Sequence, residues 1–538
     1  MKSEPVCSIQ LYFKPVIITV VKKLKLPPTR LLFCLILLLG VFVRIWEWGT
    51  LPPAINADEA SSAVDAYSLI HYGIAHNGES FPAHFISYGS GQNALYAYLT
   101  IPFIALGGLT PDNYRLPMLL SGLLTLPLVF YVGRQIAGNT FGLLAMFFIA
   151  ISPWHIILSR WGLDSNILPF LFLAGLACLY KSTANNRWFI LACLIYAFSL
   201  YAYGTAYVGV PIMVTCAAVI LWVSKRLSLS TLILGLLVLI IVGAPMVLYV
   251  VINSFNFQTI ELGVFTIPHL PTEARFHTMA AVYKSQFLHN LKSNTFNTLN
   301  MLWFQTDRQP WNDVDPFGYF YRYTLPFAFI GALGLLPLRK TGQKVEKLLL
   351  AAWLLAAVPA GMLQVVNINR INILFIPLII CMAFPLLWLK GKFQVIRWLL
   401  IGVLLVALAA FTRDYHSDRA RTDLNGVFSA GLLDAMQSVH QMNNAPVCVT
   451  SKATQAYIYA LFAEQANPAD YLASIRYDDP QSPDRIVRSF GRYTFSMQEC
   501  AERSDTIYVL LNNTELPPSS GPPLQAEHFA NFTVYKPY

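Results

Sequence analysis

Apolar runs long enough to cross a membrane recur along this chain of 538 residues, and they constrain its fold more than any other feature. A run of about 17–22 residues crosses roughly 30 Å of hydrocarbon as an α-helix, whose backbone groups all bond within the segment. With 56% hydrophobic and only 12% charged residues, the composition is not that of an ordinary soluble protein. We expect an all-α polytopic membrane protein with spans at 31–48, 116–132, 141–158, 163–180, 188–203, 206–223, 231–251, 321–338, 348–366, 371–389 and 393–411.

The net charge of +9 comes mostly from basic residues in the short connections between these runs. Such placement is typical of cytoplasmic loops, so we assign the surplus to membrane topology and expect no nucleic-acid partner. With a cytoplasmic amino terminus and these eleven spans, the carboxyl terminus lies outside and every basic connection lies inside. The basic residues are Lys22, Lys23, Lys25, Arg30, Arg134, Lys181, Arg187, Lys225, Arg226, Arg339, Lys340, Lys344, Lys347, Lys390, Lys392 and Arg397.

A shorter apolar run at 94–108 decides this count. If it spans, there are twelve spans and the later basic connections fall outside. If it lies along the membrane interface, the basic connections all fall inside. We therefore expect an interfacial helix, which Tyr96 and Tyr98 would suit.

Composition divides the chain into three regions. Residues 1–30 form a basic cytoplasmic amino terminus, and 31–412 form the transmembrane domain with external loops at 49–115 and 252–320. From Thr412 onward charged residues, Asn and Pro become common, which indicates a small extracytoplasmic α/β domain over 413–538. Its expected strands are 445–450, 505–511 and 531–535, and its expected helices lie near 427–442 and 452–466.

Cys448 and Cys500 are the two cysteines of this outer domain, among eight in the chain. An oxidising compartment permits a bridge between them, so we expect a disulfide. Five other cysteines fall within predicted spans, where packing as small apolar side chains is the simpler role. They are Cys34, Cys178, Cys193, Cys216 and Cys381.

Asp58 and Glu59 follow the first span in a chain that is otherwise poor in charge. Ionisable groups at a membrane boundary are costly, which makes this pair a candidate for function. The alternative is helix capping, because acidic residues favour the first turn of a helix and 58–71 has a helical pattern.

Three arginines are placed on the same side as the acidic pair. Arg160 and Arg370 lie in predicted external turns, and Arg115 opens the second span. Each could instead be an interfacial anchor. A carboxylate and arginines facing outward suit sugar transfer from a lipid-linked phosphate, since the carboxylate deprotonates the acceptor hydroxyl and arginine stabilises the departing phosphate. A phosphate leaves already charged and, unlike the leaving oxygen of a glycosidase, needs no carboxylic acid to protonate it.

Other chemistries lack their sequence signatures. The chain contains no P-loop, no H-E-x-x-H and no C-x-x-C, and its ten histidines do not follow metal-ligand spacing. We predict no metal site, with a divalent metal as an open alternative.

The order of short motifs resembles the GT-C class of membrane glycosyltransferases, in particular the family of protein O-mannosyltransferases and the lipid A aminoarabinose transferase. The similarity covers most of 30–412. Its motifs are Asp58-Glu59, Gly107 to Arg115-Leu116-Pro117, Gly142-Leu143-Leu144-Ala145, Ser152-Pro153-Trp154-His155 through Ser159-Arg160, and Arg370-Ile371-Asn372.

The resemblance implies a GT-C fold of about eleven transmembrane helices and a polyprenyl-phosphate-linked sugar donor. It makes Asp58 the catalytic base and Glu59 its neighbour in the catalytic loop. Two positions depart from the family pattern: Asp164 comes one residue early, and Gln92 stands where a basic residue is common. The candidates for the donor phosphate are Arg160, Arg370 and Arg115, and the candidate substrate contacts are His155, Asp164 and Gln92.

These inferences favour an enzyme that transfers a sugar with inversion. The acceptor is a hydroxyl of a lipid, glycan or protein on the outer face of a plasma membrane. One alternative is an oligosaccharide or O-antigen-type ligase that uses a lipid pyrophosphate donor. Another is a secondary transporter, which would carry charges at the midplane of its spans. The interiors of the predicted spans are nearly free of charge, which disfavours transport.

Overall fold

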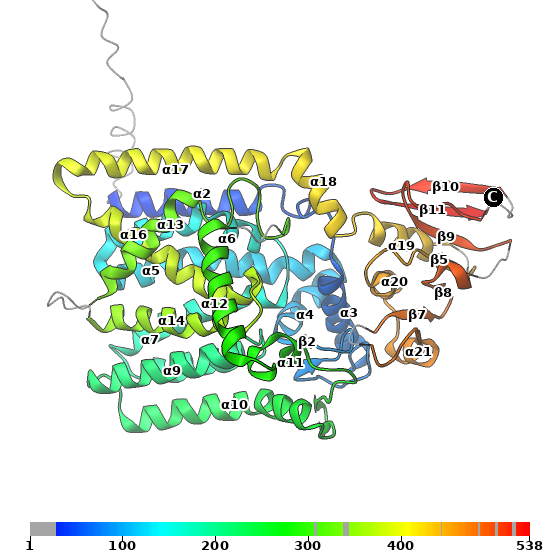
Figure 1. Ribbon diagram of the computed structural model, residues 1–538, viewed down its shortest axis with the longest axis horizontal. Coiled ribbons are helices and arrows are strands. Elements are labelled where there is room, and N and C mark those ends of the chain that lie inside the picture. The colour runs from blue at the N-terminus through cyan, green and yellow to red at the C-terminus, as the bar shows by residue number, and fades with distance from the viewer. Residues whose placement is uncertain are drawn as a thin grey trace, which may run out of the picture.

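The computed structural model describes residues 28–305, 309–336, 344–442, 444–482, 485–500, 504–518 and 523–537. A bundle of long helices with roughly parallel axes makes up most of it, and a mixed α/β domain packs at one end (Figure 1). The predicted cytoplasmic segment 1–30 lies almost entirely outside the described residues.

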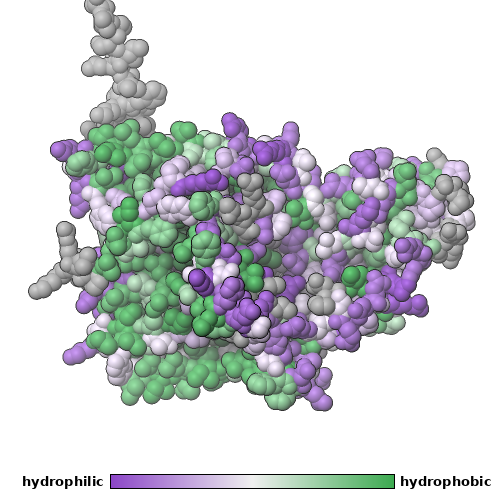
Figure 2. All heavy atoms as spheres, viewed as in Figure 1, coloured by the Kyte–Doolittle hydropathy of each residue, from purple (hydrophilic) through white to green (hydrophobic). Residues whose placement is uncertain are grey.

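Eight helices in the described ranges, counted with their leading turns, are long and apolar enough to cross a membrane. Apolar side chains cover the visible face of the bundle, and hydrophilic side chains gather on and beside the α/β domain (Figure 2). The predicted polytopic helical protein is therefore confirmed, while the count of eleven stays a prediction. The eight include α2 (Pro28–Ile45), α5 (Pro111–Ile151), α7 (Leu168–Ser182), α9 (Ala206–Val223), α10 (Leu229–Phe255), α14 (Lys344–Leu363), α16 (Phe375–Trp388) and α17 (Gln394–Tyr415).

Helix α5 contains two of the predicted spans, because its path reverses at Ala137 and Gly138. Gly138 has φ of 84°, which glycine adopts without a steric cost. A Cβ added to Gly133 would stand 2.9 Å from the Cα of Gly142, so the two legs touch backbone to backbone. Small residues allow this close approach between membrane helices. The predicted spans 188–203 and 321–338 correspond to the shorter helices α8 (Trp188–Ser199) and α13 (Leu325–Ala332).

The loop predicted to be the first external one carries helix α3 and helix α4 (Leu95–Gly107), with strands β1 (His84–Phe85) and β2 (Gln92–Asn93) between them. Helix α3 runs over Ala57–Tyr72. Helix α4 has 13 residues, about as many as α8, so the expected interfacial helix stays a prediction.

The other segments that were predicted to be external form short elements around the same end of the bundle. The long loop between α10 and α13 carries α12 (Phe287–Phe304), which bonds to the end of α14 from Asn294 to Met362 O (3.2 Å). The other elements are α6 (Pro153–Leu158), α15 (Ile368–Ile371), α11 (Arg275–Met279), β3 (Ile260–Leu262) and β4 (Phe265–Ile267).

The connections between α9 and α10 and between α16 and α17, which carry Lys225, Arg226, Lys390 and Lys392, lie at the bundle end that faces away from the α/β domain (Figure 1). There Arg226 pairs with Glu346 at 3.4 Å, and the Lys181 ammonium lies 4.2 Å from the ring centroid of Trp188. One end of the bundle is thus basic, and the other carries the external loops of the sequence prediction.

The carboxyl-terminal domain contains a seven-stranded mixed sheet of order β10-β11-β9-β5-β8-β7-β6. The expected strands correspond to β5 (Val447–Val449), β9 (Ile507–Leu511) and β11 (Phe532–Pro537), and β5 runs parallel to β9. The expected α/β domain is confirmed. Its further elements are α18 (Asp418–Val427), α19 (Leu432–His440), α20 (Ala456–Glu464), α21 (Pro468–Ser474), β6 (Arg476–Tyr477), β7 (Val487–Phe490), β8 (Tyr493–Thr494) and β10 (Leu524–His528).

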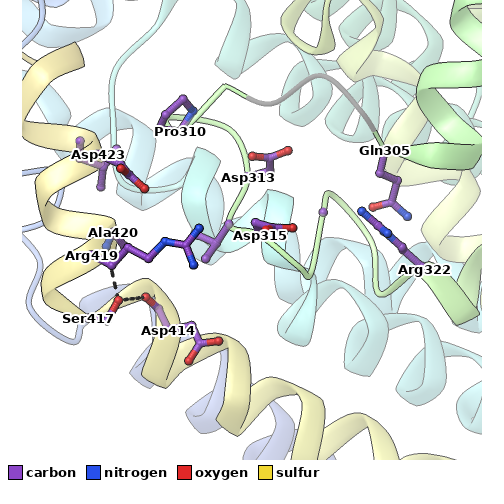
Figure 3. Close-up of a pocket in the computed structure, with 13 residues that line it drawn as sticks. Gln305, Pro310, Asp313, Asp315, Arg322, Asp414, Ser417, Arg419, Ala420 and Asp423 are labelled. Carbon is purple, nitrogen blue, oxygen red and sulfur yellow. Dashed lines mark hydrogen bonds between the residues drawn. The ribbon is translucent and has the colours of Figure 1, made fainter.

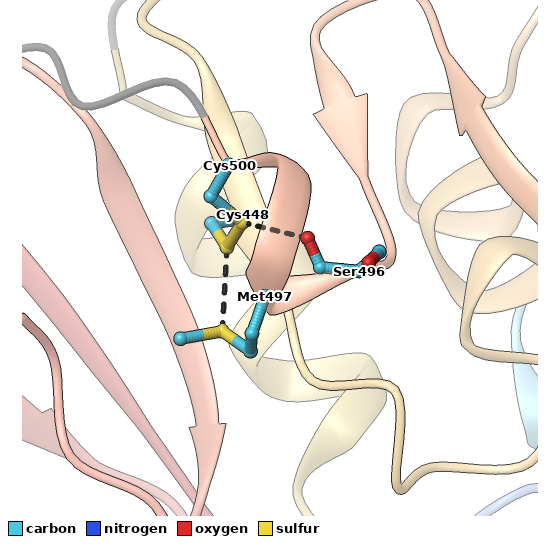
Figure 4. The surroundings of a disulfide bond; sticks show 4 residues. All are labelled: Cys448, Ser496, Met497 and Cys500. Atoms are coloured by element: carbon cyan, nitrogen blue, oxygen red, sulfur yellow. Dashed lines mark hydrogen bonds between the residues drawn. A yellow bond between two sulfur atoms is a disulfide. The ribbon is translucent and has the colours of Figure 1, made fainter.

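Cys448 and Cys500 form the predicted disulfide, with Cα atoms 5.6 Å apart (Figure 4). The bridge joins β5 to the segment that precedes β9. Met497 Sδ lies 3.4 Å from Cys448 Sγ and covers the bridge. The five cysteines predicted within spans are free thiols.

Candidate active site

A cavity of ≈ 440 Å³ lies where the external segments meet the ends of α9, α10 and α14. Two carboxylates, Asp58 and Asp164, and two guanidinium groups, Arg275 and Arg370, line it. Its walls also present amides and phenol rings, from Gln92, Asn93, Asn367, Tyr203, Tyr207 and Tyr249. Convergent polar groups in a partly apolar pocket are typical of ligand sites.

Asp58 lies in the first turn of α3, half-buried at the cavity wall. The helix is capped by its neighbours: Glu59 N donates to Asn56 Oδ1 (2.9 Å), and Asn56 N donates to Glu59 Oε2 (3.2 Å). Capping therefore belongs to Asn56 and Glu59. The backbone of Asp58 is fixed separately, since Gln92 Nε2 donates to its carbonyl (2.9 Å).

Asp164 is held toward the same cavity by the strand that precedes α4. Asn93 Nδ2 donates to its Oδ2 (2.7 Å), and Ser165 N donates to its Oδ1 (2.7 Å). The turn itself is fixed by Asn372 Nδ2, which donates to Ser165 O (2.8 Å).

Arg275 is a cavity residue that the sequence interpretation missed. Its Nε donates to Ser90 Oγ (3.2 Å), and its N–H donates to Ser90 O (3.2 Å). Burial lowers the pKa of Arg275, but the nearby carboxylates of Asp58 and Asp164 raise it by more, so the net pKa lies above its usual value. A sequence signal existed, because Arg275 is the one Lys or Arg between Arg226 and Lys284.

Arg370 lines the cavity from α15. Its Nη1 donates to Val365 O (2.8 Å), and its own carbonyl accepts from Thr205 Oγ1 (2.9 Å). The arginine is half-buried, so part of its guanidinium faces the open space.

Glu59 and Arg115 form a buried ion pair outside the cavity lining. Arg115 donates from Nε to Glu59 Oε1 (2.8 Å) and from Nη2 to Glu59 Oε2 (2.6 Å). Glu59 Oε1 also accepts from Gly162 N (2.6 Å), and Arg115 Nη2 donates to Ala54 O (2.6 Å). This pair ties the segment before α3 to α5 and to the 159–162 turn.

Arg160 and His155 are likewise buried outside the cavity lining. Arg160 donates to the carbonyls of Leu51 (3.0 Å), Arg44 (3.0 Å) and Glu47 (2.7 Å). His155 Nδ1 accepts from Arg44 Nη2 (2.7 Å). These contacts fasten the end of α2 to the turn around α6.

His84 supplies an uncharged ring to the cavity wall. Burial lowers the pKa of His84 to about 3, and the charge of Arg275 contributes to the lowering. Its ring stacks on Tyr249 with centroids 4.3 Å apart, and its Nδ1 bonds to Phe85 O (3.1 Å). The imidazole is therefore neutral at physiological pH.

Within the described part of the chain, no group of three or more His, Cys, Asp or Glu side chains could hold a metal ion. The oxygen donors of the cavity include the carboxylates of Asp58 and Asp164 and the amides of Gln92 and Asn93. This is the ligand type that hard divalent cations take.

A second cleft of ≈ 370 Å³ lies between the end of α17 with the start of α18 and the 310–322 segment (Figure 3). Ser417 caps α18 there by accepting from Ala420 N (3.3 Å). None of the residues predicted for the site lines this cleft. Its charged lining residues are Asp313, Asp315, Asp414, Asp423, Arg322 and Arg419.

No family model and no curated protein sequence matches the chain. Among solved structures it is similar to ArnT from Cupriavidus metallidurans bound to undecaprenyl phosphate, with a TM-score of 0.57 and 12% identity. The match covers 94% of this chain and 97% of that one. The chain has the GT-C fold. The same ArnT in its apo state matches with a TM-score of 0.53.

A second GT-C protein, the oligosaccharyltransferase of Archaeoglobus fulgidus in its apo form, matches with a TM-score of 0.50 and 14% identity. The match covers 82% of this chain, which spans 64% of the length of the archaeal protein. The GT-C fold expected from the motifs is confirmed. At 12% and 14% identity, the sequences alone retain little sign of this structural similarity.

Proposed function

We propose that this chain is a membrane glycosyltransferase, which transfers a sugar from a polyprenyl-phosphate donor to an acceptor hydroxyl. One observation carries the proposal: in a GT-C fold, Asp58 shares a single cavity with Arg275 and Arg370. The fold is shared with a protein solved with undecaprenyl phosphate bound, which supports a donor of that class.

Asp58 acts as the general base in this proposal. Its carboxylate takes the proton of the acceptor hydroxyl while the hydroxyl oxygen attacks the anomeric carbon. The bond from that carbon to the phosphate oxygen breaks on the opposite face, and its electron pair leaves with the polyprenyl phosphate. The products are the inverted glycoside, polyprenyl phosphate and a proton on Asp58.

Arg275 and Arg370 bind the donor phosphate and stabilise the charge that develops on it. A guanidinium suits this task because its fork of N–H donors matches two phosphate oxygens. Arg115 and Arg160 are assigned a structural role instead, because Glu59 and backbone carbonyls occupy their donors. His155 is assigned with them.

In this proposal the sugar hydroxyls bind to the other fixed polar groups of the cavity wall. Asp164 is held by Asn93 and accepts hydroxyl hydrogen bonds, and Gln92 lies beside Asp58. The stacked rings of His84 and Tyr249 provide an apolar face for the pyranose or furanose ring.

The decisive experiment compares the envelope glycans of cells that carry the wild-type chain, no chain, or the Asp58→Asn variant. We expect one glycan to lose a sugar in the deletion and in Asp58→Asn. Asp112→Asn is the matched control, since Asp112 lies in the first turn of α5 and outside the cavity lining. Normal glycans in cells with Asp58→Asn would remove Asp58 from the role of base.

Orientation in the plasma membrane is part of the same proposal: the amino terminus lies in the cytoplasm and the α/β domain outside. Thr110 caps the start of α5, and Gln135 lies near the reversal at the far end of its first leg. In intact cells an impermeant thiol reagent should label Thr110→Cys and spare Gln135→Cys. Labelling at position 135 would show that the orientation is not the one proposed.

A ligase that uses a pyrophosphate-linked donor is the second candidate, and the fold shared with an oligosaccharyltransferase favours it. The released lipid distinguishes the two reactions. Purified protein that releases polyprenyl phosphate supports the transferase, and release of polyprenyl pyrophosphate supports the ligase.

A further inference from the structure

The backbone around Asp58 is held by two buried tyrosine hydroxyls. Tyr88 donates to the carbonyl of Ala57 (2.5 Å), the residue directly before Asp58. Tyr459 donates to the carbonyl of Ile55 (3.1 Å), just ahead of the Asn56 cap. Tyr88 and Tyr459 are 4% and 1% exposed, so water does not compete for these bonds.

Tyr459 belongs to α20 of the carboxyl-terminal domain, and that domain also holds Tyr88. Arg485 N donates to the carbonyl of Tyr88 (3.0 Å). The next residue, Gly89, has φ of 99° and is enclosed, since an added Cβ would stand 3.2 Å from Arg485 Cγ and 3.1 Å from Thr272 Oγ1. The carboxyl-terminal domain therefore fixes the backbone of Tyr88, and the Tyr88 hydroxyl bonds to the Asp58 turn of the transmembrane domain.

The same turn is held from the membrane side by Glu59, through Arg115 and Gly162. The turn from Ile55 to Glu59 thus lies between the two domains and is bonded to both. Contacts from the carboxyl-terminal side reach the carbonyl of Ile55 directly and that of Ala57 through Tyr88, and both carbonyls precede Asp58. They do not reach the cavity, since no residue of that domain lines it among the residues described.

We propose that the carboxyl-terminal α/β domain is a positioning element for Asp58, acting directly through Tyr459 and through Arg485 by way of Tyr88. The step from positioning to catalysis rests on the proposed function. A general base must lie within hydrogen-bond reach of the proton it takes, and a displacement of about 1 Å can lower a rate about a hundredfold. Tyr88 and Tyr459 are positioning residues that touch no substrate.

The first test needs no substrate. Amide hydrogen exchange is measured on the full-length protein in detergent for wild type, Tyr88→Phe, Tyr459→Phe and Tyr67→Phe. The informative amides are Glu59 N and Ala60 N, which bond to Asn56 in the wild type.

Tyr67→Phe is the matched control. It also removes a tyrosine hydroxyl from the interface of α3 with the carboxyl-terminal domain, where Tyr67 donates to Gln465 Oε1 (2.9 Å), but more than two helical turns from Asp58. We expect Tyr88→Phe and Tyr459→Phe to speed exchange at Glu59 and Ala60 at least about threefold, and Tyr67→Phe to leave it unchanged. Unchanged exchange in all three variants overturns the proposal, and so does an equal increase in all three.

The second test separates positioning from stability. In the transfer assay, Tyr88→Phe and Tyr459→Phe should each lower kcat about tenfold, with the donor KM within about twofold of wild type. Their melting temperatures should match that of Tyr67→Phe. A wild-type kcat in both variants, or a loss explained by lower melting temperatures, also overturns the proposal. If the wild type transfers no sugar, the proposed function fails while the exchange result still decides whether the domain holds this turn.

Discussion

Asp58 and Glu59 are neighbours in the sequence and face opposite surroundings. Glu59 is buried, with its oxygens occupied by Arg115, Gly162 N and Asn56 N. Asp58 lines a cavity with Arg275 and Arg370. The arginines divide in the same way, because Arg115 and Arg160 are buried outside the cavity lining, whereas Arg275 and Arg370 line it.

In an apolar protein, the surroundings of a charged side chain indicate whether it stabilises the fold or serves a ligand. A buried charge whose bonding groups are all taken up by carbonyls and counter-charges fixes the fold. A charge that keeps part of its surface toward a cavity is available to a ligand. Arg115, Arg160 and Arg370 share their residue type and their position at a predicted span end, so tertiary contacts decide the role of each.

The largest expected effect on stability is that of Glu59→Gln. It leaves the Arg115 charge buried without its counter-charge and should cost about 3–5 kcal/mol of folding free energy. The measurement is the apparent melting temperature in detergent, with Asp58→Asn as the control that should lose much less stability. Equal melting temperatures of the two variants would show that Glu59 and Asp58 contribute equally to the stability of the fold.

Arg275→Ala should lower the transfer rate about 100- to 1000-fold, or about 2.7–4 kcal/mol in the activation free energy, since it removes a donor from the developing charge. Arg275→Lys should retain part of the rate, because lysine keeps the charge and loses the fork. Rates are measured on purified protein with a polyprenyl-phosphate sugar.

Arg160→Ala is the opposite case. It removes three bonds to carbonyls near the end of α2, so it should lower the melting temperature and leave the rate per folded molecule near that of wild type. If Arg160→Ala slows the folded enzyme as much as Arg275→Ala does, the division of the arginines is wrong.

Glu79 represents a third kind of charge, a carboxyl whose Oε2 is buried without a hydrogen bond from the described residues. Burial raises the pKa of Glu79 to about 7, and the charge of Asp65 adds to the rise. Because the folded pKa exceeds the ordinary value of 4.5, the native state binds more protons between these values. The stability that Glu79 contributes is complete below the lower value and is lost as the pH rises through the higher one.

The test is the pH dependence of melting. Between about pH 5.5 and about pH 8, the wild type should lose about 1–3 °C more than Glu79→Gln. His76 nearby contributes in the same direction, since Asp65 raises its pKa despite the opposing effect of burial. Parallel pH profiles for the two proteins would show that Glu79 is already ionised in the fold.

Much of this architecture could be predicted because its signals are local. Apolar runs mark the membrane helices, and hydrophobic β-rich segments mark the central strands β5, β9 and β11. The edge strand β6 was missed because its two residues, Arg476 and Tyr477, are polar and too few to give a strand pattern. The apolar runs 116–132 and 141–158 form the two legs of α5, and the chain reverses between them at Gly138.

The residues of the site were predicted less completely than the architecture. Asp58, Asp164, Gln92 and Arg370 were chosen from the sequence and line one cavity. Arg115 and Arg160 carried the same local signal as Arg370, an arginine at a span end, and only their distant partners set them apart. Arg275 was missed because its approach to Asp58 depends on how the long external loop folds back.

The smallest effect should come from Arg421, which approaches the same residue as Arg160. Arg160 Nη2 is buried and donates to the backbone carbonyl of Glu47 (2.7 Å), whereas Arg421 Nη2 pairs with the Glu47 carboxylate (2.5 Å) at a site open to water. An exposed pair contributes about 0–1 kcal/mol, because water and salt screen it. Arg421→Ala should therefore shift the melting temperature slightly at low salt, and not at all in about 0.5 M salt, where screening is nearly complete. A salt-independent loss as large as that of Arg160→Ala would mean that water exposure does not separate the two arginines, and burial would no longer explain which charges hold this fold together.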